Sequence, residues 1–349
     1  MIPLVSILVP AYNSEKYISA TLDSAIGQTW TRKEIIVVDD GSSDRTNEIA
    51  GRYANRNVKV VQGAHRGAAA ARNVALSLAQ GDYIQWLDAD DLLGPHKIER
   101  QIEAVNRDGG EKTLYSCAVG RFYWRPDRAS FTENVLWRDH QPLDGLRLKF
   151  SDNVFLQPAA WLVGRSPTEM AGPWDERLTN DDDGEYFCRV IRKSDYIRFV
   201  PKALVYYRRK ASGSLANVGR DAKKLNSLWL SMKLQIQQVR AVDDSPETRA
   251  ACMRYIQSSF PAFYPERTEI VSEACALAAE LGGELAIPKL GWKYEWMRAA
   301  FGWSTVKTAQ VYARNLRVLA AERYDRLRFE MQASSKYGDI LKLLRELEM

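Results

Sequence analysis

The first ninety residues alternate between two hydrophobic periods, and this alternation constrains the fold more than any other feature of the chain. Short apolar runs, which are typical of buried strands, occur at residues 5–9, 35–38, 58–61 and 83–87. Segments with apolar residues at three- and four-residue steps, which are typical of helices, lie between them at 14–28 and 68–79. Strands that alternate in this way with helices predict an α/β fold built on a parallel sheet.

The pattern changes along the rest of the chain. Helices are predicted at 95–108 and 183–193, and strands at 113–124 and 203–209. After Ser212-Gly213 the pattern is almost entirely helical. We therefore predict an α/β catalytic domain over residues 1–214, followed by a helical C-terminal region over residues 215–349.

Composition narrows the class of protein. Of the 349 residues, 46% are hydrophobic and 27% are charged, which is ordinary for a globular protein. The net charge of +5 is too mild for a dedicated nucleic-acid binder, but it suits an anionic ligand or an acidic membrane surface. No apolar stretch is long enough to span a bilayer, and the N-terminus does not resemble a signal peptide.

The cysteines indicate the compartment. The four of them are far apart and form no C-x-x-C pair; they are Cys117, Cys188, Cys252 and Cys275. This spacing suits neither a zinc site nor a disulfide framework, so we expect a cytoplasmic protein, which could lie at the inner face of the membrane.

Three polar clusters follow predicted strands, where ligands bind in open parallel sheets. They are Pro10-Ala-Tyr-Asn13, Asp39-Asp-Gly-Ser-Ser-Asp44 and Asp88-Ala-Asp-Asp91. Each alone could be a plain turn, because these residue types favour turns. Three such clusters at the same edge of one sheet indicate a ligand site.

The cluster at Asp88-Ala-Asp-Asp91 is the most informative. Three carboxylates within four residues repel one another unless a cation neutralises them. Oxygen ligands favour Mg²⁺ or Mn²⁺. On an extended segment Asp88 and Asp90 point to the same side, so one can reach a sugar while the other holds the metal. Such a metal would neutralise a leaving diphosphate.

At this point the sequence resembles glycosyltransferase family 2, whose members are inverting enzymes of the GT-A fold with a Rossmann-like sheet. The resemblance rests on five motifs in a fixed order. They are Val5-Ser-Ile-Leu-Val-Pro-Ala-Tyr-Asn13, Ile36-Val-Val-Asp-Asp-Gly-Ser-Ser-Asp44, Gly67-Ala-Ala-Ala-Ala-Arg-Asn73, Gly81-Asp-Tyr-Ile-Gln-Trp-Leu-Asp-Ala-Asp-Asp91 and Trp174-Asp-Glu-Arg-Leu-Thr-Asn-Asp-Asp-Asp-Gly-Glu185.

The resemblance implies a donor pocket for a nucleotide sugar, with UDP as the expected carrier. Tyr12 would stack on the base, and Asp39 or Asp40 would bond a base N–H group. Asp88 would contact the ribose, and Asp90, with Asp88, would hold the Mn²⁺ or Mg²⁺ ion. The residues implied against the donor are Pro10, Ala11, Tyr12, Asn13, Asp39, Asp40, Arg66, Arg72, Asp88, Ala89 and Lys210.

A second acidic run, Asp181-Asp-Asp183, precedes a predicted helix. These residues could simply cap that helix and oppose its dipole. The resemblance implies instead that an acidic pair lies here, and counting back from Arg189 matches it to Asp182 and Asp183. Asp183 is then the predicted general base that takes the proton of the acceptor hydroxyl.

The sequence departs from the family near the last predicted strand, where many members carry a histidine that touches the diphosphate or metal. Here the segment reads Tyr206-Tyr-Arg-Arg-Lys-Ala-Ser-Gly-Ser214. Lys210 or Arg209 could supply positive charge to the diphosphate, but neither is a normal metal ligand. The chain's three histidines are far apart in the sequence and form no catalytic or metal-binding set; they are His65, His96 and His140.

The leading hypothesis is transfer of a sugar to a saccharide or lipid-linked saccharide in bacterial surface-polysaccharide assembly. Trp124, Trp137 and Trp161 are candidate platforms for the acceptor, or core residues. Two alternatives remain open. A nucleotidyltransferase would usually carry a glycine-rich loop after the first strand, and none is present. A non-catalytic nucleotide-sugar-binding protein would not need Asp88, Asp90 and Asp183 intact.

The C-terminal segment 289–349 carries 12 Lys and Arg residues against 7 Asp and Glu residues. Aromatic residues alternate with basic ones near its start, at Trp292, Tyr294, Trp296, Phe301 and Trp303. This pattern fits an amphipathic helix packed on the catalytic domain, a peripheral membrane contact, or helix-mediated dimerisation.

Overall fold

The protein folds around a nine-stranded mixed sheet. A computed structural model describes residues 2–54, 57–108, 110–155, 157–210, 221–332 and 339–348. Within these residues the strand order is β3-β2-β1-β4-β8-β6-β9-β5, with β7 paired to β6. The strands are β1 (Val5–Ala11), β2 (Lys33–Asp39), β3 (Val58–Gln62), β4 (Tyr83–Trp86), β5 (Leu92–Leu93), β6 (Thr113–Phe122), β7 (Ser130–Phe131), β8 (Leu162–Gly164) and β9 (Tyr196–Arg208).

The first half of the sheet has the predicted Rossmann-like arrangement. Strands β3, β2, β1 and β4 are all parallel, with Leu8 of β1 paired to Ile36 of β2 and to Trp86 of β4. Strand β8 then runs antiparallel to both β4 and β6, while β6 and β9 are parallel to each other. The prediction of an α/β fold with a Rossmann-like sheet and a helical C-terminal region is confirmed.

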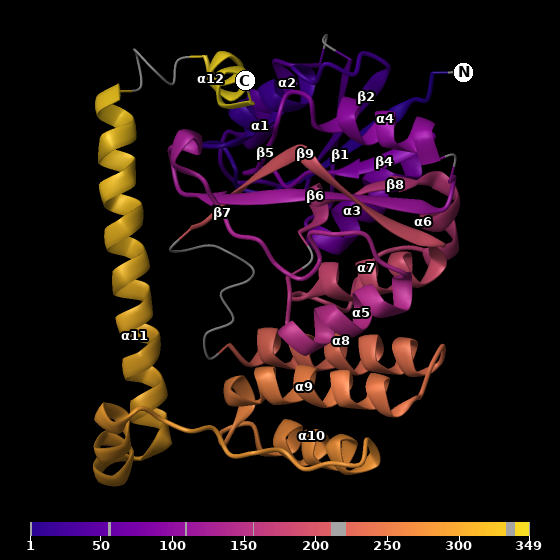
Figure 1. Ribbon diagram of the computed structural model, residues 1–349. Helices are drawn as coiled ribbons and strands as arrows, with labels where there is room; N and C mark the ends of the chain where they lie inside the picture. Colours follow the sequence, from indigo (N-terminus) through magenta and orange to yellow (C-terminus); the bar gives the residue numbers. More distant parts are fainter. Residues whose placement is uncertain are drawn as a thin grey trace.

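Helices cover both faces of this sheet (Figure 1). Helices α1, α2 and α4 lie on one side, and α3, α6 and α7 on the other. Strands such as β1 and β2 are therefore buried on both faces, which is why they read as continuous apolar runs. The helices of this part are α1 (Ile18–Ile26), α2 (Thr46–Gly51), α3 (Ala68–Leu78), α4 (Lys97–Asp108), α5 (Pro142–Asp152), α6 (Arg165–Ala171) and α7 (Asp182–Lys193).

The C-terminal helices share the core of the sheet domain. One hydrophobic cluster runs from Val5 in β1 to Leu281, which follows α10. Helix α8 packs on α7, and α9 packs on α5. The predicted domain boundary between residues 214 and 215 lies outside the described residues. The helices of this region are α8 (Ala222–Arg240), α9 (Pro246–Phe263), α10 (Thr268–Glu280), α11 (Trp292–Gln332) and α12 (Ile340–Glu348).

Helix α11 stands apart from the other helices as a long column at one edge of the molecule (Figure 1). Gly302, with φ of 77°, breaks its helical conformation near the start. Helix α12 then packs back on the sheet domain, where Leu344 is buried beside Leu92 and Phe122. None of the described helices is both long enough and apolar enough to cross a membrane.

The structure extends the predicted elements in several places. The strand predicted at 203–209 is the second half of the longer β9, and the helix predicted at 14–28 begins only at Ile18. Strands β5 and β7, with two residues each, are too short to produce a periodic pattern. Trp161, a candidate acceptor platform, is instead a core residue that stacks on Phe187.

Candidate active site

The three predicted polar clusters meet at one edge of the sheet, because they follow the parallel neighbours β2, β1 and β4. Pro10 and Ala11 are the last residues of β1, and Ala11 pairs with Asp39 at the end of β2. The backbone N–H of Asp40 donates to the carbonyl of Ala11 at 2.8 Å. The two loops therefore leave the sheet side by side.

Tyr12 presents an open ring on this edge. Its side chain is 47% exposed, and its ring centroid lies 4.7 Å from that of His65. The imidazole Nδ1 of His65 hydrogen-bonds the carbonyl of Asp40 at 3.0 Å, which holds the imidazole beside Tyr12. An exposed aromatic ring supported from one side suits stacking by a planar base on the other.

Asp40 organises the loop that enters α3. Its Oδ1 accepts the backbone N–H of Arg66 at 2.9 Å, and its Oδ2 accepts that of Gly67 at 2.7 Å. Gly67 has φ of 100°, a left-handed conformation that favours glycine. Each carboxylate oxygen has two lone pairs, so Asp40 retains capacity to accept a base N–H group.

Asn13 and Asp39 hold the loops after β1 and β2 together. The Oδ1 of Asn13 accepts the backbone N–H of Ser43 at 2.8 Å, and its own N–H donates to the hydroxyl of Ser42 at 2.9 Å. That hydroxyl in turn donates to Asp39. Of the two adjacent carboxylates, Asp39 thus braces its own turn while Asp40 faces the loop before α3.

Arg72 joins the two acidic centres of the sequence. It lies in α3 with only 5% of its surface exposed, so it is a buried arginine and not a surface one. One guanidinium nitrogen donates to Asp182 at 2.6 Å, and another donates to Asp88 at 2.9 Å. Its guanidinium carbon lies 4.4 Å from the ring centroid of Trp174. A single buried cation therefore neutralises carboxylates from two distant segments.

The three carboxylates of the cluster after β4 lie in different environments. Asp91 is fully buried, accepts the backbone N–H of Arg208 at 2.7 Å and accepts the side-chain amide of Gln157. Burial raises the pKa of Asp91 well above its ordinary value, and the charges of Asp90 and Asp88 add to this effect. Asp91 supports the loop, Ala89 is buried, and Asp88 and Asp90 are left to face the site.

Asp90 forms an ion pair with the ammonium group of Lys210. Lys210 lies two residues after the end of β9, in the segment where the family often carries a histidine, and its Nζ also lies 5.1 Å from the ring centroid of Tyr17. Arg208, which the sequence interpretation passed over in favour of Arg209, reaches the same loop and donates to the carbonyl of Asp90 at 2.8 Å.

Within the described residues no three His, Cys, Asp or Glu side chains converge as a ready-made metal site. The carboxylates of Asp88 and Asp90 are hard oxygen donors of the kind that Mg²⁺ and Mn²⁺ prefer. Mg²⁺ usually binds through one or two carboxylates together with substrate phosphates. The residues present therefore fit a metal that arrives with a diphosphate, rather than one held by protein ligands alone.

Arg72 connects the second acidic run, Asp181 to Asp183, with the acidic cluster after β4. Asp181 precedes α7 in a left-handed conformation with φ of 58°, and its side chain makes no cap hydrogen bond to the helix. The carboxylate of Asp182 is held by Arg72. Asp183 accepts the backbone N–H of Gly184 at 2.8 Å, and burial followed by the charges of Asp182 and Asp181 raises its pKa well above the ordinary value.

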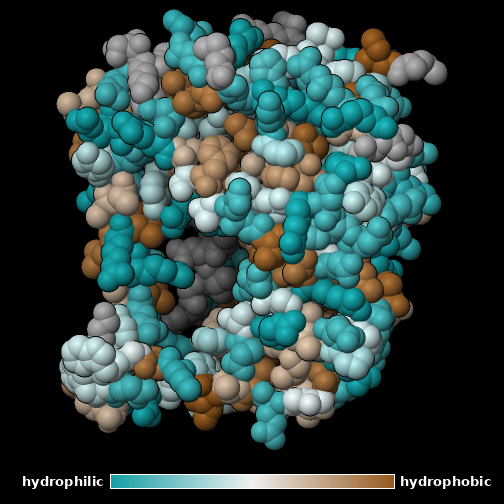
Figure 2. Space-filling view, in the orientation of Figure 1, coloured by the Kyte–Doolittle hydropathy of each residue, from teal (hydrophilic) through white to brown (hydrophobic). Residues whose placement is uncertain are grey.

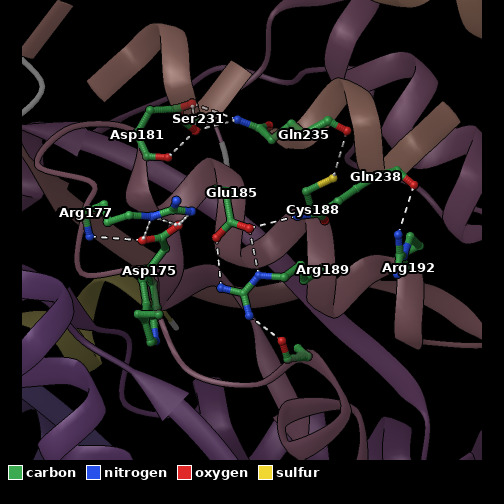
Figure 3. Close-up of polar contacts among 12 residues, drawn as sticks. Asp175, Arg177, Asp181, Glu185, Cys188, Arg189, Arg192, Ser231, Gln235 and Gln238 are labelled. Carbon is green, nitrogen blue, oxygen red and sulfur yellow. Dashed lines mark hydrogen bonds and ion pairs between the residues drawn. The ribbon is translucent and has the colours of Figure 1, made fainter. Parts of the chain in front are cut away.

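Helix α8 of the C-terminal region donates hydrogen bonds to the acidic run (Figure 3). Ser231 donates to Oδ2 of Asp181 at 2.7 Å, and the side-chain amide of Gln235 donates to the same atom at 2.8 Å. One turn earlier, the hydroxyl of Ser227 accepts the backbone N–H groups of Thr179 and Asn180. Sequence reasoning missed these residues, although three polar side chains at four-residue steps along one face of α8 were a usable signal.

Helix α7 is braced in the same way at its next turn. Arg189 donates two hydrogen bonds of 2.8 Å to the carboxylate of Glu185, which also accepts from Gln238 of α8 at 2.8 Å (Figure 3). The arginine from which the acidic pair was counted is therefore a structural anchor of α7. By contrast Arg66 is exposed and pairs with Glu176, beside Asn73.

Comparisons with known proteins bear on the family and the fold of the chain. The family model described as Glycosyl transferase family 2 matches residues 6–169. An uncharacterized glycosyltransferase of Rickettsia typhi is 39% identical over 227 residues, which cover 65% of this chain and 70% of the relative. The uncharacterized glycosyltransferase EpsJ of Bacillus subtilis is 31% identical over 60% of this chain and 62% of its own length.

Another relative, an uncharacterized glycosyltransferase of Rickettsia felis, is 26% identical over 70% of this chain. The chain spans only 41% of that relative and, as above, 62% of EpsJ.

Solved structures share the fold. TarS 1-349 of S. aureus in complex with UDP-GlcNAc has a TM-score of 0.64 at 19% identity, over 79% of this chain and 81% of that chain. The mannosyltransferase PcManGT of Pyrobaculum calidifontis, in complex with GDP-Man and Mn²⁺, has a TM-score of 0.55 at 19% identity, over 93% and 88% of the two chains. The sheet, the ordered motifs and the Rickettsia typhi relative lead to one conclusion: the chain belongs to glycosyltransferase family 2 and has the GT-A fold.

Proposed function

We propose that this protein transfers a sugar from a nucleotide sugar, with UDP as the preferred carrier, to a hydroxyl group of a saccharide acceptor. The observation that carries the proposal is the bridge made by Arg72 between Asp88 and Asp182. It brings the donor-side carboxylates after β4 and the acidic run before α7 into one site, as a two-substrate displacement requires.

The donor half of the site would use Tyr12 for the base and Asp40 for a base N–H group. Asp88 and Asp90 would hold a Mn²⁺ or Mg²⁺ ion, which when bound neutralises the charge that develops on the leaving diphosphate. Structural neighbours bind UDP-GlcNAc in one case and GDP-Man with Mn²⁺ in the other, which supports this class of donor. Lys210, beside Asp90, adds a second positive charge on the diphosphate side.

The acceptor half would use Asp183 as general base. Its carboxylate takes the proton of the acceptor hydroxyl as that oxygen forms a bond to the anomeric carbon. The bond from the anomeric carbon to the diphosphate oxygen breaks, and the electron pair leaves with the nucleoside diphosphate. Attack from the face opposite the leaving group inverts the anomeric configuration. A base with a raised pKa is closer to neutrality and suits this proton transfer.

The acceptor we propose is a saccharide or lipid-linked saccharide of bacterial surface-polysaccharide assembly. Trp124 and Trp137 are half-buried aromatic side chains that remain candidates for stacking on a sugar ring. The four thiols are unpaired, three of them buried, which suits a reducing cytoplasm as the place of reaction.

The test is a panel of nucleotide sugars with Mn²⁺, assayed for release of nucleoside diphosphate. We expect turnover with one donor and a loss on the order of 100-fold in Asp90→Asn. Glu273→Gln, an exposed carboxylate on α10 that pairs with Lys233, is the matched control and keeps wild-type turnover. Release of pyrophosphate from a nucleoside triphosphate and a sugar phosphate would indicate a nucleotidyltransferase instead. Binding of a donor without turnover would indicate a non-catalytic binding protein.

A further inference from the structure

Helix α11 carries an apolar stripe that faces away from the protein. Tyr312, Leu316, Tyr324, Leu327 and Met331 are between 61% and 76% exposed. Their separations are four, eight, three and four residues, so they lie along one face of the helix. Figure 2 shows brown and teal side chains alternating on this edge of the molecule. A row of exposed large apolar residues on a long helix marks an interaction surface.

The opposite face of α11 is already packed. Asp325 is buried, accepts the backbone N–H of Trp124 at 2.8 Å, and accepts the guanidinium of Arg125 at 2.6 Å. The ring of Phe329, four residues later on the same face, lies 5.8 Å from that of Trp124. These contacts fix the rotation of the helix, so the apolar stripe is the face left for a partner outside this domain.

The charges beside the stripe are positive. Residues 303–332 contain six Lys and Arg residues and three Asp and Glu residues. Asp325 is paired with Arg125, and Glu330 is paired with Arg326. Arg317, Arg323 and Arg328 are exposed on the same helix. A partner for this face therefore meets apolar and aromatic side chains flanked by positive charge.

We propose that this face of α11 docks on an anionic lipid surface. Leucine and methionine side chains suit the boundary between headgroups and acyl chains, tyrosine rings suit the headgroup level, and arginines bind lipid phosphates. A second copy of the chain fits less well. Two-fold pairing places the same stripe of each copy face to face, and would set the flanking arginines of one copy near those of the other.

The docking face connects to the candidate active site through direct contacts. Trp124, which packs on the inner face of α11, has its ring centroid 5.6 Å from that of Tyr17. The ring of Tyr17 lies 5.1 Å from the ammonium of Lys210, which pairs with Asp90. A membrane bound along α11 would therefore hold the acidic cluster at a fixed distance from the lipid surface, which suits an acceptor presented there.

The experiment is flotation of the full-length protein with phosphatidylcholine vesicles and with vesicles that also contain about 30% phosphatidylglycerol. We expect flotation with the anionic vesicles, at least tenfold weaker binding to the neutral ones, and weakening by added salt. Replacement of Leu316, Leu327 and Met331 by glutamine should reduce binding at least tenfold. Replacement of Arg317, Arg323 and Arg328 by glutamine should reduce binding to anionic vesicles by a similar factor.

The matched control replaces Met170, Val242 and Ile287 by glutamine, since these apolar side chains are exposed on other segments. This control should float as the wild type does, and circular dichroism should show that all variants are folded. Absence of wild-type flotation, or flotation that survives both triple replacements, overturns the proposal. A dimer in solution that the stripe variant dissolves, without flotation, assigns the face to a second copy instead. Donor turnover without vesicles is measured separately, so loss of docking and failure of the proposed enzymatic activity are distinguishable.

Discussion

A guanidinium nitrogen of Arg72 lies 2.6 Å from the carboxylate of Asp182, although 110 residues separate them in the chain. The same side chain reaches Asp88 at 2.9 Å and lies over the ring of Trp174. Burial alone would lower the pKa of Arg72, but the charges of Asp182 and Asp88 outweigh it and raise that pKa above its already high value, so the guanidinium stays charged at every accessible pH. The arginine therefore fixes the distance between the two acidic centres of the site.

Arg72→Gln should destabilise the fold and reduce activity together. The substitution leaves two carboxylates without their buried cation, a type of loss that costs about 3 kcal/mol. Urea denaturation measures this loss as a lower free energy of unfolding. Arg177→Gln is the control, because Arg177 is exposed and pairs with Asp175 at the surface; it should change stability by about 0.5 kcal/mol at most. Equal stability of the two variants would contradict the role assigned to the bridge.

Much of the sheet edge that carries the candidate donor site could be predicted from the sequence, because its determinants are local. Apolar runs fix β1, β2 and β4, and the polar residues directly after them fall at one edge of a parallel sheet. Tyr12, Asp40 and Asp90 therefore lie where their motifs indicated. The position of Arg72 was ambiguous, because a helix pattern does not show which arginine has a distant carboxylate as partner.

The contacts made by the C-terminal helices were not predictable in the same way. Ser231 and Gln235 bind Asp181 across about fifty residues, at a meeting point that depends on how α8 packs on α7. The pairing of Lys210 with Asp90 also depends on tertiary structure, since β9 must bring its end beside the loop after β4. Hydrophobic periodicity describes single elements, and it does not describe which polar groups meet when elements pack.

Asp183→Asn should abolish transfer while leaving donor binding unchanged. The amide keeps the shape of the carboxylate but cannot take the proton of the acceptor, so kcat should fall by about 10²–10⁴-fold. Calorimetric titration with the nucleotide sugar should give the wild-type dissociation constant. Asp175→Asn serves as control, since its carboxylate pairs with the exposed Arg177. A kcat within about threefold of wild type in Asp183→Asn would remove Asp183 as the base.

The raised pKa of Asp183 should appear in the pH dependence of both activity and stability. Activity requires the ionised carboxylate, so kcat should fall as the pH drops through a pKa above the ordinary value of about 4. The free energy of unfolding should change with pH in the opposite direction. The folded state holds the proton more tightly than the unfolded state, so the free energy of unfolding should decrease as pH rises from the unfolded pKa to the folded pKa.

Asp183→Asn removes this contribution, while that of Asp91, which has the same sign, remains in both proteins. The difference between their stability profiles, measured by urea denaturation from pH 4 upward, therefore isolates Asp183. Parallel profiles for the two proteins would show that the pKa of Asp183 does not change on folding.

Lys210→Gln should strengthen the binding of Mn²⁺ to the free protein by about tenfold. The ammonium group now occupies the carboxylate of Asp90, and its removal frees that carboxylate as a metal ligand. Lys210→His should tighten binding further, because imidazole is itself a ligand. Electron paramagnetic resonance of unbound Mn²⁺ measures both effects without an activity assay. Lys233→Gln, which breaks the surface pair with Glu273, should leave Mn²⁺ binding unchanged.

Ser231→Ala should lower kcat without altering the donor KM. The hydroxyl of Ser231 lies 2.7 Å from the carboxylate and 2.8 Å from the carbonyl of Asp181, so its one O–H group can donate to either oxygen and holds the left-handed residue that precedes the predicted base. Without this hydroxyl the run from Asp181 to Asp183 has more freedom, and misplacement of a base by a fraction of an ångström reduces kcat about tenfold or more.

The control is Ser258→Ala on α9, where the serine is exposed and its hydroxyl donates to the carbonyl of Tyr255 in the same helix. A merely structural role for Ser231 would reduce the free energy of unfolding by about 1–2 kcal/mol and leave kcat intact at temperatures where the variant is fully folded. A fall in kcat with unchanged donor KM under those conditions means that α8 positions the base. In that case helices that follow the matched family segment, residues 6–169, take a direct part in assembling the active site.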